Sequence, residues 1–277
     1  MQRRFAQVDV FTTGPGLGNP LAVVLDGDGL TTAEMQRFAT WTNLSETSFV
    51  VSGTDDRADY TVRIFTPTAE IPFAGHPTLG TCHAWLEAGG VARDPERVIQ
   101  ACGSGLVEVR RMADGLAFRE PPMLRWGPVD EEDLVLVAAA LEIGREEILE
   151  ATWCDNGPGW MAILLASAER VLELRIGPSL HLDLGIVGPY PSGSPAALEV
   201  RGAWPEHGSI VEDPATGSLN ASVARWLIDK GVVTAPYVAT QGAAIGRAAR
   251  ISVTQDPDGT ILVGGRSVTV VTGTVDL

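Results

Sequence analysis

Two short segments of this sequence, one in each half, have the same design. Residues 72–80 (PFAGHPTLG) and 212–220 (EDPATGSLN) each join an extended run to a helix through a small turn rich in glycine and proline. The start of a helix carries backbone N–H groups without intrahelical partners and the positive end of the helix dipole, so it can hold an anion. The chain therefore looks built twice, and two such starts facing one cleft could hold a small anion.

The helix that follows each turn is predicted to be buried. Leu79, Cys82 and Leu86 recur at helical spacing, and other apolar residues occupy the remaining faces, so a helix over 77–86 would be apolar nearly all round. Apolar residues recur at the same spacing after Asp213. A helix of this kind belongs inside a core, so each half should enclose one helix.

The remaining elements are short. Thr31 or Thr32 can cap a helix that runs to about Thr42, with Glu34 near its positive end and Asn43 as its stop. In the first half we predict strands at 6–11, 21–25, 49–51, 60–65, 98–101, 106–111 and 116–120. In the second half we predict helices at 131–141, 145–151 and 168–174, a strand at 160–166, a loop at 185–195, and strands at 249–254, 260–263 and 267–275.

Length and charge limit what the chain can be. Its 277 residues suit two domains, and Pro121 and Pro122 break the pattern where a boundary would lie. Thirty-five acidic against twenty basic residues give a formal net charge of −15, which opposes nucleic acid or an anionic membrane surface as a partner. An acidic protein can still bind an anionic substrate locally.

The cysteines and the N-terminus favour a cytoplasmic protein. Cys82, Cys102 and Cys154 are odd in number and lack CxxC or Cys/His ligand spacing, so neither a disulfide framework nor a metal site is indicated. Residues 1–10 contain no apolar signal-peptide core, and no stretch reaches the roughly 18 apolar residues that span a bilayer.

Three residues are candidates for chemistry, and each has an ordinary structural interpretation. Glu46 lies in a polar stretch between a helix and an apolar strand, where it could be a solvated loop residue. His76 lies between Gly75 and Pro77 at a helix start, where it could exchange protons or act as a capping group. Asp213 could be a plain N-cap.

The second turn gains weight from its neighbours. Besides Asp213 it contains Thr216, Gly217 and Ser218, so a carboxylate, backbone donors and hydroxyl groups converge at one helix end. Other glycine-rich stretches are weaker, because residues 14–18 (GPGLG) and 241–250 (QGAAIGRAAR) fail the spacings of nucleotide-binding loops. Cys154 could be imagined as a nucleophile, but a single cysteine is more often a small apolar residue.

Taken together, the motifs resemble the PhzF-like (phenazine biosynthesis) isomerase family over nearly the whole chain. The segments that carry this resemblance are DVF (9–11), GNPLAVV (18–24), NLSET (43–47), RIFTP (63–67), FAGHPT (73–78), DPATGS (213–218) and QG (241–242).

The resemblance implies the diaminopimelate-epimerase fold, an α+β architecture. Two similar domains would each wrap a β-barrel-like sheet around a central α-helix, with the active site in the inter-domain cleft. Because the last strand of this fold returns to the first domain, we expect residues 1–120 plus 267–277 in the N-terminal domain and 121–266 in the C-terminal domain.

The resemblance also implies a mechanism. Epimerases and racemases of this fold use two cysteines at the two helix starts, where Ala74 and Pro214 are expected here, so a two-thiol reaction is disfavoured. PhzF-like enzymes resemble cofactor-independent isomerases in which one glutamate moves a proton. Carried over, Glu46 is the general acid/base, His76 and Asp213 bind and polarise the substrate, and the remaining site residues supply donors to its carboxylate: Gly75, Gly217 and Ser218.

The expected partner is therefore a small anionic, carboxylate-bearing substrate, with no cofactor and no metal, and a homodimer is the expected assembly. Two alternatives stay open at this point. One is an epimerase or racemase of an amino-acid-like substrate. The other is a non-catalytic small-molecule-binding protein that retains the fold.

Overall fold

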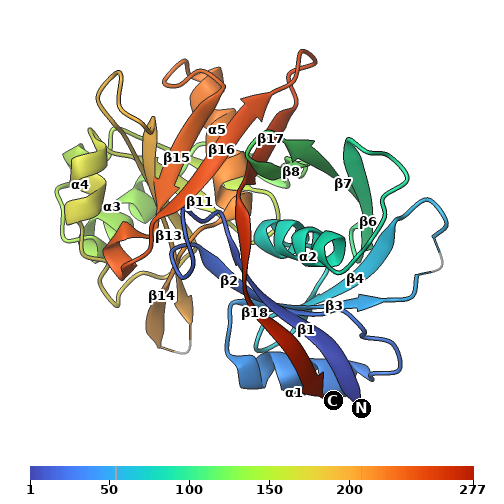
Figure 1. The fold of residues 1–277 in the computed structure, drawn as a ribbon. Helices are drawn as coiled ribbons and strands as arrows, with labels where there is room; N and C mark the ends of the chain where they lie inside the picture. Colours follow the sequence, from blue (N-terminus) through green and yellow to red (C-terminus); the bar gives the residue numbers. More distant parts are fainter. Residues whose placement is uncertain (54, 207) are drawn as a thin grey trace. The chain divides into compact units, whose positions relative to one another are not determined.

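The helices and strands of the computed structural model follow the same order twice along the chain (Figure 1). The structure describes residues 1–53, 55–206 and 208–277. The first series is β1 (Gln2–Val10), β2 (Asn19–Val24), α1 (Thr32–Thr42), β3 (Glu46–Val51), β4 (Tyr60–Phe65), β5 (Glu70–Ile71), α2 (Gly75–Glu87), β6 (Arg97–Cys102), β7 (Gly105–Met112) and β8 (Gly115–Arg119).

The second series repeats this order. It is β10 (Glu150–Asp155), β11 (Met161–Leu164), α4 (Ala168–Glu173), β12 (Leu184–Pro189), β13 (Leu198–Glu206), β14 (Ser209–Asp213), α5 (Gly217–Asp229), β15 (Tyr237–Gln241), β16 (Ala249–Gln255) and β17 (Ile261–Gly265). Four elements precede or interrupt it, and a long strand ends the chain: β9 (Arg125–Gly127), α3 (Glu131–Ala140), η1 (Arg145–Glu147), η2 (Ala243–Ile245) and β18 (Ser267–Asp276).

These elements form two compact units. Unit 1 comprises Met1–Arg119 and Gly264–Leu277, and unit 2 comprises Glu120–Val263. Each unit is a sheet with one long internal helix, so the α+β fold of two similar domains is confirmed. Among the described residues, no helix is both long and apolar enough to cross a membrane.

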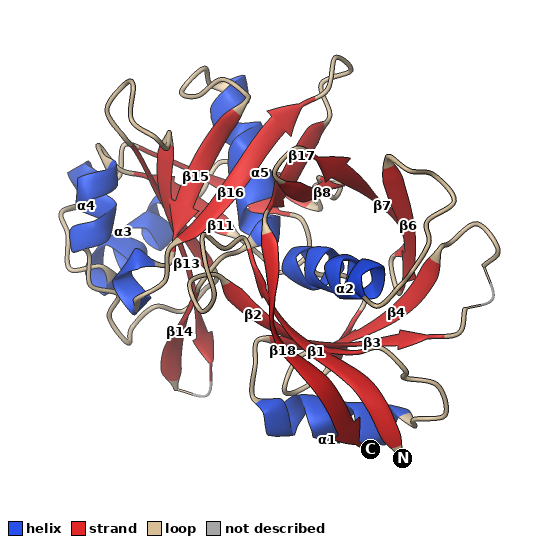
Figure 2. Ribbon diagram, viewed as in Figure 1, coloured by secondary structure: helices blue, strands red, loops and turns tan. Residues whose placement is uncertain are grey.

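The sheet of unit 1 curves around α2. Its order is β18-β1-β2-β3-β4-β6-β7-β8, with β5 paired to β4; neighbours are antiparallel except for the parallel pairs β2–β3 and β4–β6. Helix α2 contacts β1, β2, β3, β6, β7, β8 and β18, and Figure 2 shows it enclosed by strands. Gly80 of α2 permits this close packing, since a Cβ there would lie 2.7 Å from Cδ2 of Leu21 on β2.

Unit 2 has the equivalent strand pairings. Its order is β9-β10-β11-β12-β13-β15-β16, with β14 paired to β13; the parallel pairs β11–β12 and β13–β15 correspond to those of unit 1. Helix α5 contacts β10 and β16. It packs closely on β12 and β13, because a Cβ on Gly185 would lie 2.4 Å from Cδ1 of Leu219, and one on Gly202 would lie 2.8 Å from Oγ1 of Thr216.

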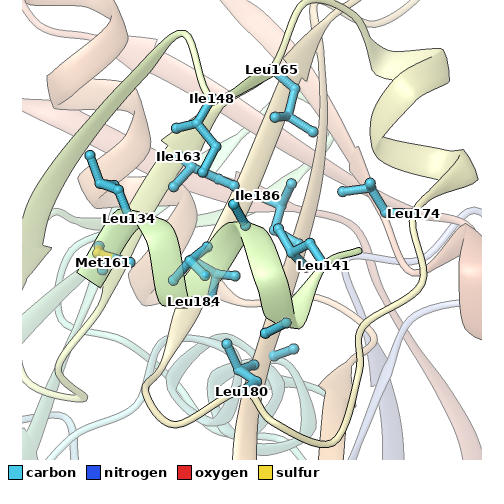
Figure 3. Close-up of a cluster of buried hydrophobic side chains, with 14 of the residues drawn as sticks. Leu134, Leu141, Ile148, Met161, Ile163, Leu165, Leu174, Leu180, Leu184 and Ile186 are labelled. Carbon is cyan, nitrogen blue, oxygen red and sulfur yellow. The ribbon is translucent and has the colours of Figure 1, made fainter. Parts of the chain in front are cut away.

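A second apolar layer lies under α3 and α4. Figure 3 shows Leu134 of α3 and its C-cap residue Leu141 packed with Ile163 of β11 and with Leu184 and Ile186 of β12. All five side chains are buried. Sheet residues therefore pack on α5 through one set of positions and on the outer helices through another.

Local signals explain the elements that the sequence predicts well. Thr31 caps α1 in a reciprocal capping box with Glu34, and Asn43 ends the helix in the left-handed conformation.

Three expectations are wrong. The helix expected at 145–151 is a single 3₁₀ turn, η1, followed by the strand β10, in which partly buried residues alternate with buried ones after Glu150.

The other two corrections concern glycine and proline. The loop expected at 185–195 begins with the buried strand β12, whose glycines make room for neighbours: Gly185 faces Leu219, and a Cβ on Gly188 would lie 2.3 Å from the carbonyl oxygen of Ser167. Helix α5 begins at Gly217 with Thr216 as its N-cap, so Thr216 rather than Pro214 stands at the helix start.

We predict that Gly185→Val destabilises the protein by about 1–3 kcal/mol, the usual cost of overpacking a core. The new side chain would collide with Leu219, which is fully buried in α5. Urea unfolding measures the change. Gly273→Val on β18 is the matched control, because a Cβ there meets nothing within 4 Å, and equal effects of the two substitutions would contradict the packing argument.

Candidate active site

The structure brings Glu46 and His76 together in unit 1. Glu46 is the first residue of β3, just after the turn that ends α1, and His76 is the second residue of α2. Nε2 of His76 lies 3.3 Å from Oε2 of Glu46, and their side chains are only 6% and 16% exposed. Gly75 precedes His76 and is also buried, so these predicted site residues of unit 1 form one cluster, the unit 1 cluster.

Burial controls the charge of His76. Desolvation lowers the pKa of His76 to about 3, so its imidazole is neutral at physiological pH. Despite the short distance to Glu46, Nε2 makes no hydrogen bond of good geometry with any described residue. A buried polar atom left in this state costs about 1–3 kcal/mol, so it is a natural contact point for a ligand.

Two further residues that the sequence did not single out support the cluster. Nδ2 of Asn19 lies 3.4 Å from Nδ1 of His76, on the opposite side of the ring from Glu46. Asn19 follows a tight loop that Asp9 holds, because Oδ2 of Asp9 accepts hydrogen bonds from the backbone N–H groups of Leu17 at 2.9 Å and Gly18 at 3.0 Å. Both Asp9 and Asn19 lie in motifs that carry the family resemblance, and this was the sequence signal that could have identified them.

The structure brings Asp213, Gly217 and Ser218 together in unit 2, as a second cluster at the start of α5. Asp213 is the last residue of β14, and its Oδ2 accepts a hydrogen bond from the Thr216 hydroxyl at 2.7 Å. Gln241 braces this turn: its Oε1 accepts the backbone N–H of Thr216 at 3.0 Å, and its Nε2 donates to Oγ1 of Thr216 at 2.8 Å. We call this group the unit 2 cluster.

A loop between β10 and β11 holds Ser218. The indole N–H of Trp160 donates to Oγ of Ser218 at 3.1 Å, and the Asn156 amide donates to the Ser218 carbonyl at 2.9 Å. Oδ1 of Asp155 fixes the loop by accepting the backbone N–H groups of Gly157 and Gly159 at 2.7 and 2.8 Å. This loop stands at the same place in the repeat as the loop that Asp9 holds in unit 1.

Both enclosed helices begin without a side-chain cap from their N-cap residues. The N-cap residues are Ala74 for α2 and Thr216 for α5, and among described residues neither provides a side-chain cap. Neither first turn contains an acidic residue. The N–H groups and positive dipole ends are therefore uncompensated by side chains within the first turn, a condition that favours an anion.

The cysteines stand elsewhere. Cys82 lies within α2 and Cys154 within β10; both are buried, and burial raises the pKa of each thiol to about 12. Burial also raises the pKa of Cys102. All three would be protonated at neutral pH, and none is at a helix start.

A cavity of about 690 Å³ on unit 1 lies apart from these clusters, since no predicted site residue lines it. Its aspartates are engaged by the protein. Asp28 accepts from the backbone and hydroxyl of Ser52, and Asp59 accepts from the backbone N–H groups of Arg93 and Ile99. This pattern is typical of loop stabilisation rather than of catalysis.

Comparison with known proteins agrees with the resemblance. The family model described as phenazine biosynthesis-like protein matches residues 8–273. The chain is 33% identical to Antisense-enhancing sequence 1 of Schizosaccharomyces pombe, and the match covers 98% of both chains. It is 32% identical to trans-2,3-dihydro-3-hydroxyanthranilate isomerase of Pseudomonas fluorescens, and that match covers 87% of this chain and 86% of the relative. Its fold is similar to the crystal structure of the PhzF-family phenazine biosynthesis protein of Bacillus anthracis, with a TM-score of 0.85, 22% identity and 100% coverage of both chains.

We predict that His76 makes the protein less stable in acid. Its pKa is about 3 in the folded protein, against about 6.5 for an imidazole in the unfolded chain, so below pH 6.5 the unfolded chain binds a proton that the folded chain does not. The free energy of unfolding should then fall by about 1.4 kcal/mol per pH unit between pH 6.5 and 3 from this group alone.

Urea unfolding at several pH values between 7.5 and 4 measures this loss in the wild type and in His76→Gln. The variant should lose less stability on acidification, whereas His181→Gln, which changes an exposed histidine, should follow the wild type. Parallel curves for the wild type and His76→Gln would show that His76 does not stay neutral in the folded protein.

Proposed function

Because this chain belongs to the phenazine biosynthesis-like, PhzF-like family of isomerases, we propose that it moves a proton within a small carboxylate-bearing substrate, with Glu46 as the single general acid/base and without a cofactor. The observation that supports this most is the contact of Glu46 with the buried Nε2 atom of His76 at 3.3 Å. A carboxylate and a neutral imidazole can together take up, hold and return one proton.

The reaction needs only proton transfers. Glu46, as the carboxylate, removes a proton from a carbon of the substrate, and the electron pair of that C–H bond is delocalised over the adjacent unsaturated system. Glu46, now the acid, returns the proton to another carbon of that system. Atoms and electrons balance without a redox partner. His76 would hydrogen-bond a substrate oxygen and so stabilise the charge that develops during the transfer.

Electrostatics supports a carboxylate as the group that is bound. We propose that the backbone N–H of Gly75 donates a hydrogen bond to it in the unit 1 cluster. The unit 2 cluster offers the same chemistry, and we propose that Gly217 and Ser218 donate to a substrate carboxylate and that Asp213 helps to bind and polarise the substrate. The uncapped starts of α2 and α5 each carry about half a positive charge, and these fixed donors act at short range. The net charge of −15 is spread over the surface and is screened beyond about 8 Å at physiological salt, so it does not prevent local binding.

The thiols weigh against the epimerase or racemase alternative in its two-cysteine form. Such a reaction needs one thiolate as base and one thiol as acid at the two helix starts, whereas Ala74 and Thr216 stand there. The thiols of Cys82 and Cys154 are buried and protonated. The alternative of a binding protein without turnover is separated from an isomerase by the next experiment.

We predict that Glu46→Gln lowers the rate at which solvent deuterium is incorporated into the substrate by at least about 100-fold, because the amide cannot carry the proton. The probes are trans-2,3-dihydro-3-hydroxyanthranilate, which the Pseudomonas fluorescens relative is named for, and a panel of cyclic amino-acid-like carboxylates, assayed in heavy water by mass spectrometry.

The fold of the variant should persist, since the substitution changes volume little. Glu132→Gln on α3 is the matched control, because it makes the same change at an exposed site and should keep wild-type incorporation. If Glu46→Gln incorporates deuterium at the wild-type rate, Glu46 does not carry the proton.

A further inference from the structure

Asn19, the first residue of β2, places its amide against His76, and the geometry points to a role for it. We propose that Asn19 is a positioning residue that fixes the neutral His76 ring in the tautomer with its proton on Nε2, so that this N–H is directed to the side of Glu46 and the substrate. This inference rests on the proposed function for its catalytic meaning, but the tautomer itself is independent of any substrate.

The contact between Asn19 and His76 fixes the position of the ring proton. Nδ2 of Asn19 lies 3.4 Å from Nδ1 of His76; Asn19 is fully buried and the side chain of His76 is only 6% exposed, so water competes little for either atom. An amide NH₂ group can only donate, so Nδ1 must accept. A neutral imidazole carries a single ring proton, which must then be on Nε2.

Glu46, on the other side of the ring, favours the same position of the proton. If the Asn19 amide were turned over, its oxygen would accept from Nδ1–H and Nε2 would present a bare lone pair. That lone pair would then face Oε2 of Glu46 at 3.3 Å, in a buried setting where two acceptors repel. The carboxylate of Glu46 therefore favours the amide orientation in which Nδ2 of Asn19 faces Nδ1 of His76.

The backbone holds Asn19 in place. Asn19 pairs with Val10 at the start of β2, and the residue before it has no room for a side chain, since a Cβ on Gly18 would lie 2.2 Å from the Val10 carbonyl oxygen. Asp9 holds the same loop through the N–H groups of Leu17 and Gly18. An amide carried on such a rigid support can impose a tautomer.

The repeat supplies an independent parallel. In unit 2 the equivalent loop, held by Asp155, directs the indole N–H of Trp160 to Oγ of Ser218. An indole can only donate, so Oγ of Ser218 accepts there and its hydroxyl hydrogen is left to point elsewhere. In each unit a donor from this loop thus sets the direction of a polar group on the first turn of the enclosed helix.

The consequence concerns anions. With the proton on Nε2, His76 can donate to a substrate oxygen or to the Glu46 carboxylate. The other tautomer would turn a lone pair toward both negatively charged groups and would weaken binding and proton transfer. Asn19 would therefore act through His76, without touching the substrate.

NMR of protein labelled with ¹⁵N in its histidine rings tests the proposal. One-bond and long-range ¹H–¹⁵N correlations identify which ring nitrogen carries the proton, and His76→Gln assigns the signals of His76. We expect Nε2–H in the wild type. Finding Nδ1–H in the wild type would overturn the proposal, and this arm needs no variant to fold.

Two substitutions then test whether Asn19 is the cause. Asn19→Asp replaces the donor by an acceptor and should reverse the tautomer to Nδ1–H, while Asn19→Leu should leave a mixture of both. The rings of His83 and His181 are internal controls whose signals should not change. A wild-type pattern for His76 in both variants would show that Asn19 does not set the tautomer.

Deuterium incorporation separates this inference from the proposed function. On a substrate that the wild type turns over, Asn19→Leu should lower kcat by at least about tenfold. If the tautomer changes while the wild type and Glu46→Gln exchange equally, the proposed function fails and the positioning role stands. If Glu46→Gln alone is inactive and the tautomer of His76 is the same in all variants, the positioning role fails and the proposed function stands.

Discussion

A helix that is enclosed by a sheet can present only its ends to a ligand, and this constraint determines where each unit carries its polar groups. Strands on several sides contact α2, so its side-chain faces are committed to the core, and its apolar composition follows from that. The unsatisfied N–H groups gather at its start. His76 and the turn that precedes it occupy that start, and β3 delivers Glu46 to the same place.

The repeat shows that this arrangement is a general solution of the fold. In both units a short strand leads into a tight turn, and the enclosed helix begins without a side-chain acceptor at its N-cap and without an acid in its first turn. A side chain from the first hairpin then contacts the first helical turn. An aspartate at the end region of the first strand anchors that loop each time, Asp9 in unit 1 and Asp155 in unit 2. The two units differ in the residues on the first turn of the enclosed helix, where α2 carries His76 and α5 carries Ser218.

The sequence predicts those features that depend on neighbouring residues. The capping box of α1, the enclosed helices and the turns that begin them all leave local patterns. Strand β12 was missed because its glycines resemble loop residues, and their purpose is visible only when α5 and Ser167 lie against them. The supports of the site were missed for the same reason, since Asn19 and His76 are 57 residues apart and Trp160 and Ser218 are 58 apart.

The central claim is that Glu46 and His76 act as a pair on one carboxylate-bearing substrate. The most direct test is a crystal structure of the Glu46→Gln variant soaked with trans-2,3-dihydro-3-hydroxyanthranilate or with the panel carboxylate that the wild type turns over. The account predicts a substrate oxygen within about 2.7–3.2 Å of Nε2 of His76, with a substrate carbon against the side chain at position 46. A substrate bound away from His76, with the contact between residues 46 and 76 unchanged, would contradict it.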